Sequence, residues 1–333
     1  MTKHHLKKYI FLWKKNSNMS SLFVIAFSEV KTLFKERIFF LLLGVFIFMT
    51  LASSFIGWST YTTTNAVYHA SVIYLHQHGI AHVPSNPVLS FPALASFRNI
   101  IVYMFLIGSL MAIVVGNRSF IREQKSGVLQ LLFTRPITLS TLLLGKIIGI
   151  CFVLLSVISV TALVSIVSSY FLPLQHLGTH DVIRLLVFYV YSFFYVLLFA
   201  FLGLLFAIIA KSESLALFIP VCIWVGISFV MPELVTGQTP TALLNPVTID
   251  QMVNQGGFFS LMQQVLTPIA VGWHFTSLGS QLLNATADTR SASEILLMNK
   301  NNMIVLAIAL ISSYLLMLTA LQNYDVQSDV VNE

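Results

Sequence analysis

Residues Ile147–Leu172 read IIGICFVLLSVISVTALVSIVSSYFL, a stretch with no charged residue and no histidine. It is longer than the ~20 residues that an α-helix needs to cross a bilayer. Backbone polar groups in lipid must be satisfied within a helix or a closed barrel, and this run is too long for a barrel strand. Five further runs share its character: Ile38–Gly57, Asn99–Gly116, Leu185–Ala210, Leu215–Met231 and Met303–Leu321. The sequence therefore predicts an all-α integral membrane protein with six transmembrane helices.

The composition and the charge distribution support this class. Apolar residues make up 57% of the 333 residues and charged residues 9%, far below the roughly 25% of a soluble domain. The chain carries 18 Lys and Arg, and all but four of them fall on one side of the predicted spans. The four on the other side are Arg98, Arg184, Arg290 and Lys300. We interpret the net charge of +6 as a topology signal that places both termini in the cytoplasm, not as nucleic-acid binding.

The spans organise the chain into one membrane domain. We expect a cytoplasmic N-terminal segment at 1–37, a transmembrane domain at 38–321 and a cytoplasmic tail at 322–333. Two long outer segments, 58–97 and 232–300, mix Pro, Asn, Thr and aromatic residues, and we expect small structured caps or half-inserted hairpins there. Within the second, Phe258–Leu278 contains Pro268 and His274, so we interpret it as re-entrant or interfacial and not as a seventh span.

The N-terminal segment contains a helical pattern. Apolar residues recur at helical spacing at Phe23, Phe27, Val30 and Phe34, with Ala26 and Leu33 beside them. The other face carries Ser28, Lys31, Lys35 and Glu36. This pattern predicts an amphipathic interfacial helix on the inner membrane surface, leading into the first span.

The inner loop 118–146 between the second and third spans is basic, and it contains a short apolar helix. Residues 122–136 read REQKSGVLQLLFTRP, and the loop ends at Leu144-Gly145-Lys146. Ser126 is predicted to cap the short helix and Pro136 to end it. Val128, Leu131 and Leu132 share one face. Such a face fits either a protein partner or the bilayer surface, and the pattern alone does not choose between them.

This loop resembles the signature loop of type-2 ABC exporter permeases. In that family it forms a coupling helix that docks into an ATPase subunit, and the family fold has an interfacial helix, six spans and re-entrant outer helices between spans five and six. The resemblance implies an ATPase-coupling role for Glu123, Lys125, Gly127, Leu129, Leu132, Arg135 and Pro136. Leu244-Asn245-Pro246-Val247 is also similar to permeases of the nitrous-oxide-reductase maturation type.

The resemblance also implies partners and a location. Separate ABC ATPase subunits would hold ATP and Mg, and a second permease, identical or different, would complete the membrane unit. Outer or periplasmic proteins are further candidate partners, and membrane lipid surrounds the spans. The expected location is the cell membrane, in particular the bacterial inner membrane.

The chain carries no recognisable catalytic or nucleotide motif. Gly145-Lys146 is not a phosphate loop, because the required G-x-x-x-x-G-K-[ST] pattern is missing. We therefore expect no enzyme and no cofactor in this chain. His76, His78 and His82 are close enough in sequence to share a metal if their loop folds back, but no spacing matches a defined metal motif. Polar histidines in an outer cap are the simpler interpretation.

Together with the six predicted spans, the resemblance implies the permease of an ATP-driven exporter. Two other classes stay open at this point. An ion-coupled secondary transporter needs ionisable residues at mid-membrane, and none of the six predicted spans contains Asp, Glu, Lys, Arg or His. A non-transporting membrane scaffold is the other class, and the coupling-type loop disfavours it. The uncharged spans suit a hydrophobic or amphipathic cargo, or the transmission of force to outer partners.

Overall fold

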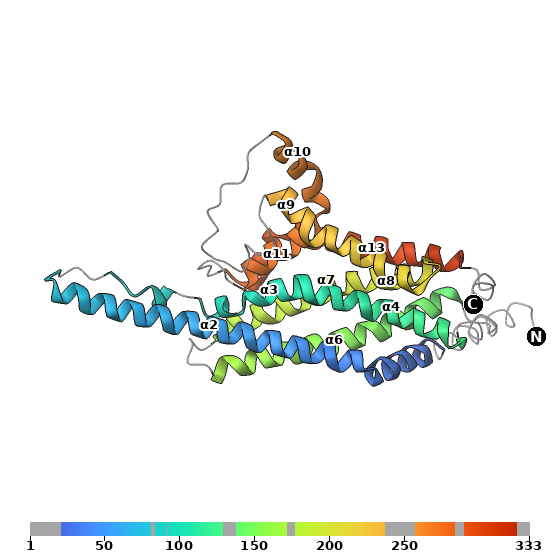
Figure 1. The fold of residues 1–333 in the computed structure, drawn as a ribbon, viewed down its shortest axis with the longest axis horizontal. Helices are drawn as coiled ribbons and strands as arrows, with labels where there is room; N and C mark the ends of the chain where they lie inside the picture. The colour runs from blue at the N-terminus through green and yellow to red at the C-terminus, as the bar shows by residue number, and fades with distance from the viewer. Residues whose placement is uncertain are drawn as a thin grey trace, which may run out of the picture.

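The computed structural model describes residues 21–80, 84–90, 92–128, 138–171, 177–236, 257–283 and 290–324. All regular structure in these ranges is helical (Figure 1). The long helices are α2 (Arg37–Gln77), α4 (Ser109–Lys125), α6 (Leu139–Phe171), α7 (Thr179–Ile209), α8 (Glu213–Val225) and α13 (Lys300–Gln322). Shorter elements are η1 (Pro87–Ser90), η2 (Ala93–Phe97), α3 (Asn99–Tyr103), η3 (Met104–Gly108), η4 (Gly226–Val230), α9 (Met231–Thr236), α10 (Gly257–Leu266), η7 (Thr267–Ile269), α11 (Val271–Leu282) and α12 (Ala292–Met298). A further helix covers residues 21–35.

Six helical segments in the described ranges are long and apolar enough to cross a membrane, which confirms the six predicted spans. They are Arg37–Gln77, Ala93–Lys125, Leu139–Phe171, Thr179–Ile209, Glu213–Leu234 and Lys300–Gln322. The first differs most from its prediction, because α2 continues as one helix for 41 residues. Residues 58–77, expected to belong to an outer cap or hairpin, extend the first span away from the bundle (Figure 1).

The segment Phe258–Leu278 does not form a seventh span. It is divided among α10, η7 and α11, and Pro268 lies in η7 at the break. Both α10, with 10 residues, and α11, with 12, are shorter than a span. Two π-helical turns, η3 in the second span and η4 in the fifth, lie beside α11, where Gly272 contacts the ring of Phe105. The wider backbone of these turns accommodates a helix end between two spans.

Polar contacts attach α11 to the outer end of the bundle. The guanidinium of the buried Arg184 donates to the carbonyls of Leu282 at 3.1 Å and Gln281 at 2.5 Å, which are the last carbonyls of α11. The ring nitrogens of His274 lie 2.8 Å from the Thr267 carbonyl and 2.8 Å from the Asn302 side-chain oxygen. These bonds connect η7 and α11 with α7 and α13, so they fix the outer helices to two spans.

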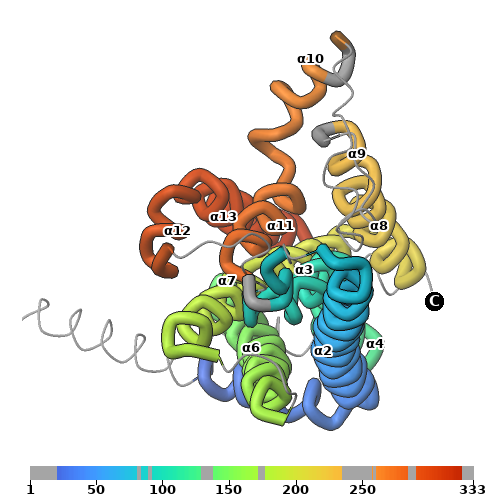
Figure 2. Tube along the Cα trace, turned by 90° about the vertical axis from the view of Figure 1, so that its left-hand side faces the viewer, coloured from blue at the N-terminus to red at the C-terminus, as the bar shows by residue number. Residues whose placement is uncertain are grey.

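Helix α7 is the centre of the bundle and contacts α4, α6, α8, α11 and α13 (Figure 2). Its crossing with α4 depends on two glycines. A Cβ added at Gly116 would overlap the Ala200 carbonyl, and one added at Gly203 would overlap the Ile113 carbonyl. Because the obstructing atoms belong to the backbone, a side chain at either position would push the two helices apart. The glycines therefore set the distance between the second and fourth spans.

The packing of this crossing predicts that glycine-to-alanine substitutions destabilise the protein at the crossing but not at an open position of α2. Gly116→Ala or Gly203→Ala should lower the free energy of unfolding by about 2 kcal/mol or more through overpacking. Gly44→Ala, in α2, meets nothing within 4 Å, and it should be neutral or stabilise the helix by about 0.5–1 kcal/mol. The melting temperatures of the purified variants in one detergent would test this. Equal melting temperatures for Gly116→Ala and Gly44→Ala would contradict the proposed packing.

Candidate functional site

The helix at residues 21–35 packs across α6 through a second pair of glycines. A Cβ at Gly145 would lie 2.7 Å from Cγ2 of Ile25, and one at Gly149 would lie 2.6 Å from Cβ of Glu29. Gly145 and Gly149 are one helical turn apart, so they form a shallow groove for two side chains that are also one turn apart. The groove brings the N-terminal helix close enough for its inner face to be buried.

The inner face of this helix differs from the predicted apolar face. Ala26, Glu29 and Leu33 are buried against the bundle, whereas Phe23 and Phe27 are 64% and 70% exposed. The helix therefore presents one face to the protein and a phenylalanine face away from it. The exposed phenylalanines fit the predicted position at the membrane surface. The helix ends before Glu36, whose extended backbone, with ψ of 140°, separates it from α2.

Lys146 of α6 has a buried ammonium at the centre of the site. The residue is 1% exposed. Its Nζ donates to the Ser119 carbonyl at 2.8 Å and forms ion pairs with Glu123 at 2.8 Å and Glu29 at 3.5 Å. Ser119 and Glu123 lie on α4, and Glu29 lies on the N-terminal helix. One cation thus connects three helices.

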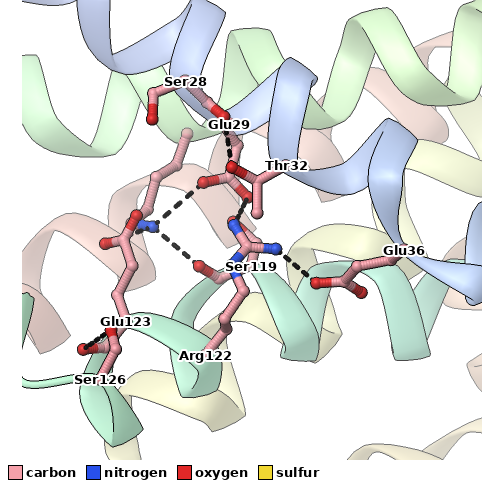
Figure 3. Close-up of polar contacts among 9 residues, drawn as sticks. Ser28, Glu29, Thr32, Glu36, Ser119, Arg122, Glu123 and Ser126 are labelled. Atoms are coloured by element: carbon pink, nitrogen blue, oxygen red, sulfur yellow. Dashed lines mark hydrogen bonds and ion pairs between the residues drawn. The ribbon is translucent and has the colours of Figure 1, made fainter.

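Arg122 extends the network toward the start of α2. Its guanidinium donates to Glu36 at 2.7 Å and to Glu29 at 3.0 Å, so Glu29 is shared between Arg122 and Lys146 (Figure 3). We call Glu29, Glu36, Arg122, Glu123 and Lys146 the inner charge cluster.

The inner charge cluster restricts the relative positions of three helices more than it adds to the net free energy of unfolding. A buried ion pair repays its desolvation cost only when its geometry is good, while loss of one partner costs about 3–5 kcal/mol. The cluster therefore permits few arrangements of the three helices.

Two further contacts attach α4 to the start of α8: Asn117 Nδ2 donates to the Ala216 carbonyl at 2.9 Å, and Lys125 pairs with Glu213 at 2.5 Å.

The residues with an expected ATPase-coupling role are only partly described. Leu129, Leu132, Arg135 and Pro136 lie outside the described residues. Glu123 points inward to Lys146, and Lys125 is exposed beside Glu213. Gly127 follows the end of α4 with a φ of +69°, a left-handed conformation that favours glycine. The expected close approach of a partner at Gly127 stays a prediction; within this chain the glycine serves the backbone turn.

Ser126 was predicted to cap the loop helix that follows it. Its hydroxyl donates to the Glu123 carbonyl at 3.2 Å, and its amide donates to the Arg122 carbonyl at 3.1 Å. Ser126 therefore takes part in ending α4. The predicted loop helix lies outside the described residues, apart from its first residues up to Val128.

Sequence reasoning missed the roles of Glu29 and Lys146. Two signals were available. Glu29 lies three residues after Ala26 and four before Leu33, which places a carboxylate on the inner face of the amphipathic helix. Lys146 lies between Gly145 and Gly149, at a spacing that allows close helix packing. Either signal predicts an ion pair only once the N-terminal helix is known to pack against α6.

The candidate histidine site receives no support from the described part of the chain. His76 and His78 are exposed at and just beyond the end of α2, and His82 lies outside the described residues. Among the described residues, no group of three or more His, Cys, Asp or Glu is positioned to hold a metal.

The six spans define a multi-pass membrane protein. Residues 23–326 match the profile of the family described as ABC-2 family transporter protein, so the chain belongs to this family. It is accordingly a membrane-spanning permease subunit of an ABC transporter, a type of complex in which partner subunits hydrolyse ATP. The match begins within the N-terminal helix, at residue 23, and therefore includes the whole inner charge cluster. A search of curated proteins found no match to the chain.

The inner charge cluster predicts a large difference between two lysines. Lys146→Met leaves the carboxylate of Glu123 without its cation and removes one of the two cations that contact the buried Glu29, so it should cost about 3–5 kcal/mol of unfolding free energy. Lys125→Met removes an exposed pair and should cost about 0–1 kcal/mol. Thermal unfolding of the purified variants would measure both effects.

A double variant separates charge from packing. Adding Glu123→Gln to Lys146→Met removes the carboxylate that lies 2.8 Å from the ammonium, so part of the lost stability should return. If the double variant is no more stable than Lys146→Met alone, the loss comes from packing and not from an unpaired charge.

Proposed function

We propose that this chain is the permease of an ATP-driven exporter in which a separate ATPase drives the membrane helices through the inner loop 118–146. The permease would carry no ATP site of its own, and ATP and Mg would bind to the partner. The observation that carries the proposal is the inner charge cluster, because it joins the end of α4, where that loop begins, to α6, where the loop ends, and to the N-terminal helix.

The geometry supports a mechanical role for this region. A push on the loop would reach α4 and α6 together, because the ammonium of Lys146 on α6 is bonded to Ser119 and Glu123 on α4. The N-terminal helix would follow through Glu29. The backbone contact between α4 and α7 at Gly116 and Gly203 would carry the displacement into the centre of the bundle. Two discrete packings of such a unit, biased by the ATPase, are what coupling requires.

The distribution of charge supports an ATP-driven mechanism over an ion-coupled one. The buried Glu29 and Lys146 lie at the inner end of the bundle, and Arg184 near its outer end donates to the carbonyls of α11. The predicted spans contain no Asp, Glu, Lys, Arg or His in the sequence, whereas an ion-coupled transporter needs such groups near mid-membrane. The cargo class that fits these spans is hydrophobic or amphipathic, or else the complex transmits force to outer or periplasmic partners.

The expected assembly contains two permeases, identical or different, each bound to one ATPase, in a bacterial inner membrane. A non-transporting scaffold is the alternative, and a rigid connection between the inner loop and three helices gives a scaffold no evident use.

A single substitution tests the coupling role. Leu132→Asp would place a charge in a desolvated contact with the ATPase at a cost of several kcal/mol, which weakens assembly by more than about a hundredfold. The variant should reach the membrane at the normal level but lose the co-purifying ATPase and its hydrolysis of ATP. Arg135→Ala should have a milder effect, because a charge at the rim mainly changes association rate and salt dependence.

The matched control is Leu297→Asp in α12, where the leucine is exposed among the outer helices. It should retain the ATPase. If Leu132→Asp retains the ATPase at the wild-type level, the coupling assignment is wrong and the scaffold function becomes the better interpretation.

A further inference from the structure

Residues 58–77 of α2 form an arm that projects past the outer ends of α6 and α7 (Figure 1). The predicted first span, Ile38–Gly57, already covers the ~30 Å hydrocarbon core at about 1.5 Å per residue. The remaining part of α2 therefore continues for about 30 Å beyond it. No Asp, Glu, Lys or Arg occurs between Ile38 and Phe97, so the arm is uncharged apart from any protonated histidine.

One face of the arm is covered by the chain that returns toward η2. The hydroxyl of Tyr68 donates to the Pro84 carbonyl at 3.0 Å, and Asn86 donates to the side-chain oxygen of Asn65 at 3.0 Å. Val88 of η1 is buried in the same region. Asn65 and Tyr68 thus have partners on this face.

The opposite face is open along its whole length. Thr63, Val67, Ala70, Tyr74 and Gln77 follow one another at alternating spacings of four and three residues, which places them on one stripe. Val67 is 60% exposed and Tyr74 is 59% exposed. This stripe combines Val67, Ala70 and Tyr74 at its centre with the uncharged polar Thr63 and Gln77 at its ends, at the spacing of a coiled-coil seam.

The arm lacks what an isolated helix needs in water. Residues 58–68 read WSTYTTTNAVY, which is rich in β-branched and aromatic residues of low helix propensity. It has no ion pairs between successive turns, because it has no charged residues. A helix of this composition depends on packing for its stability, and the returning chain supplies packing on one side only.

We propose that the open stripe binds the same stripe of a second copy of this chain, so that two arms form a parallel pair outside the membrane. The inference rests on the proposed function, in which two permeases assemble. Two copies inserted in the same orientation have parallel α2 helices whose arms project by the same length, so each residue of the stripe meets its own counterpart. Such like-to-like pairing would be repulsive for a charged stripe and is free of repulsion here.

Cysteine cross-linking in membranes tests the pairing. In a background with Cys151→Ser and Cys222→Ser, the variants Val67→Cys, Ala70→Cys and Tyr74→Cys should each give a cross-linked dimer with a short bismaleimide. The matched controls are His69→Cys and Ser71→Cys, which are equally exposed neighbours of Ala70 but point about 100° to either side of it. Their yield should be several-fold lower.

Charge substitution tests the pairing a second time, with the Val67→Cys cross-link as the measurement. When every chain carries Ala70→Glu, or every chain carries Ala70→Lys, the cross-linked dimer should be lost, because like charges would face each other. Co-expression of the Glu and Lys chains with different tags should restore a dimer that carries both tags.

The results separate this inference from the proposed function, because the co-purifying ATPase is measured in the same samples. Retained ATPase with equal cross-linking at positions 69, 70 and 71, or with none at all, would overturn the arm pairing and leave the exporter function intact. Cross-linking of position 70 to a different protein in place of a second copy would also overturn it.

Discussion

The buried ammonium of Lys146 constrains the whole inner half of this protein. A lysine that is 1% exposed must have its charge and its donors satisfied, and the partners come from two other helices: Ser119 and Glu123 from α4 and Glu29 from the N-terminal helix. This requirement explains the flanking glycines. Only with Gly145 and Gly149 can the N-terminal helix approach α6 closely enough for Glu29 to reach the ammonium.

A second close contact between helices connects this inner region to the outer end of the bundle. The contact of α4 with α7 at Gly116 and Gly203 lies farther into the bundle, and α7 in turn bears Arg184, which holds the carboxyl end of α11. The end of α4, the central helix α7 and the outer helix α11 are thus connected through one close backbone contact and buried hydrogen bonds. Because the backbones of α4 and α7 are already in close contact at this crossing, the two helices cannot move closer together there.

The sequence was sufficient for the features that depend on one segment at a time. The six spans follow from apolar length, and the family follows from the inner loop, as the match over residues 23–326 confirms. The roles of Glu29 and Lys146 could not be predicted in the same way, since each depends on which helix lies opposite. Periodicity assigned the exposed Phe23 and Phe27 to an apolar face correctly, but it did not reveal that a carboxylate occupies the face toward the protein. The arm was missed for a different reason: Thr60–Asn65 has the composition of a loop, and only packing makes it a helix.

The positions of the charged side chains in the bundle also bear on which energy source could drive it, an ion gradient or a partner ATPase. Apart from His274, which is held between Thr267 and Asn302, the buried Asp, Glu, Lys, Arg and His side chains among the described residues are Glu29 and Lys146 at the inner end and Arg184 near the outer end. Glu29 and Lys146 bond to other helices, and Arg184 donates to the last carbonyls of α11. Groups engaged in this way stabilise helix positions, whereas an ion pathway needs groups that exchange partners across the membrane. A bundle with ionic contacts at its ends and an apolar middle is suited to receiving force at the inner loop. In the proposed mechanism, the contact of α4 with α7 would carry that force into the centre of the bundle.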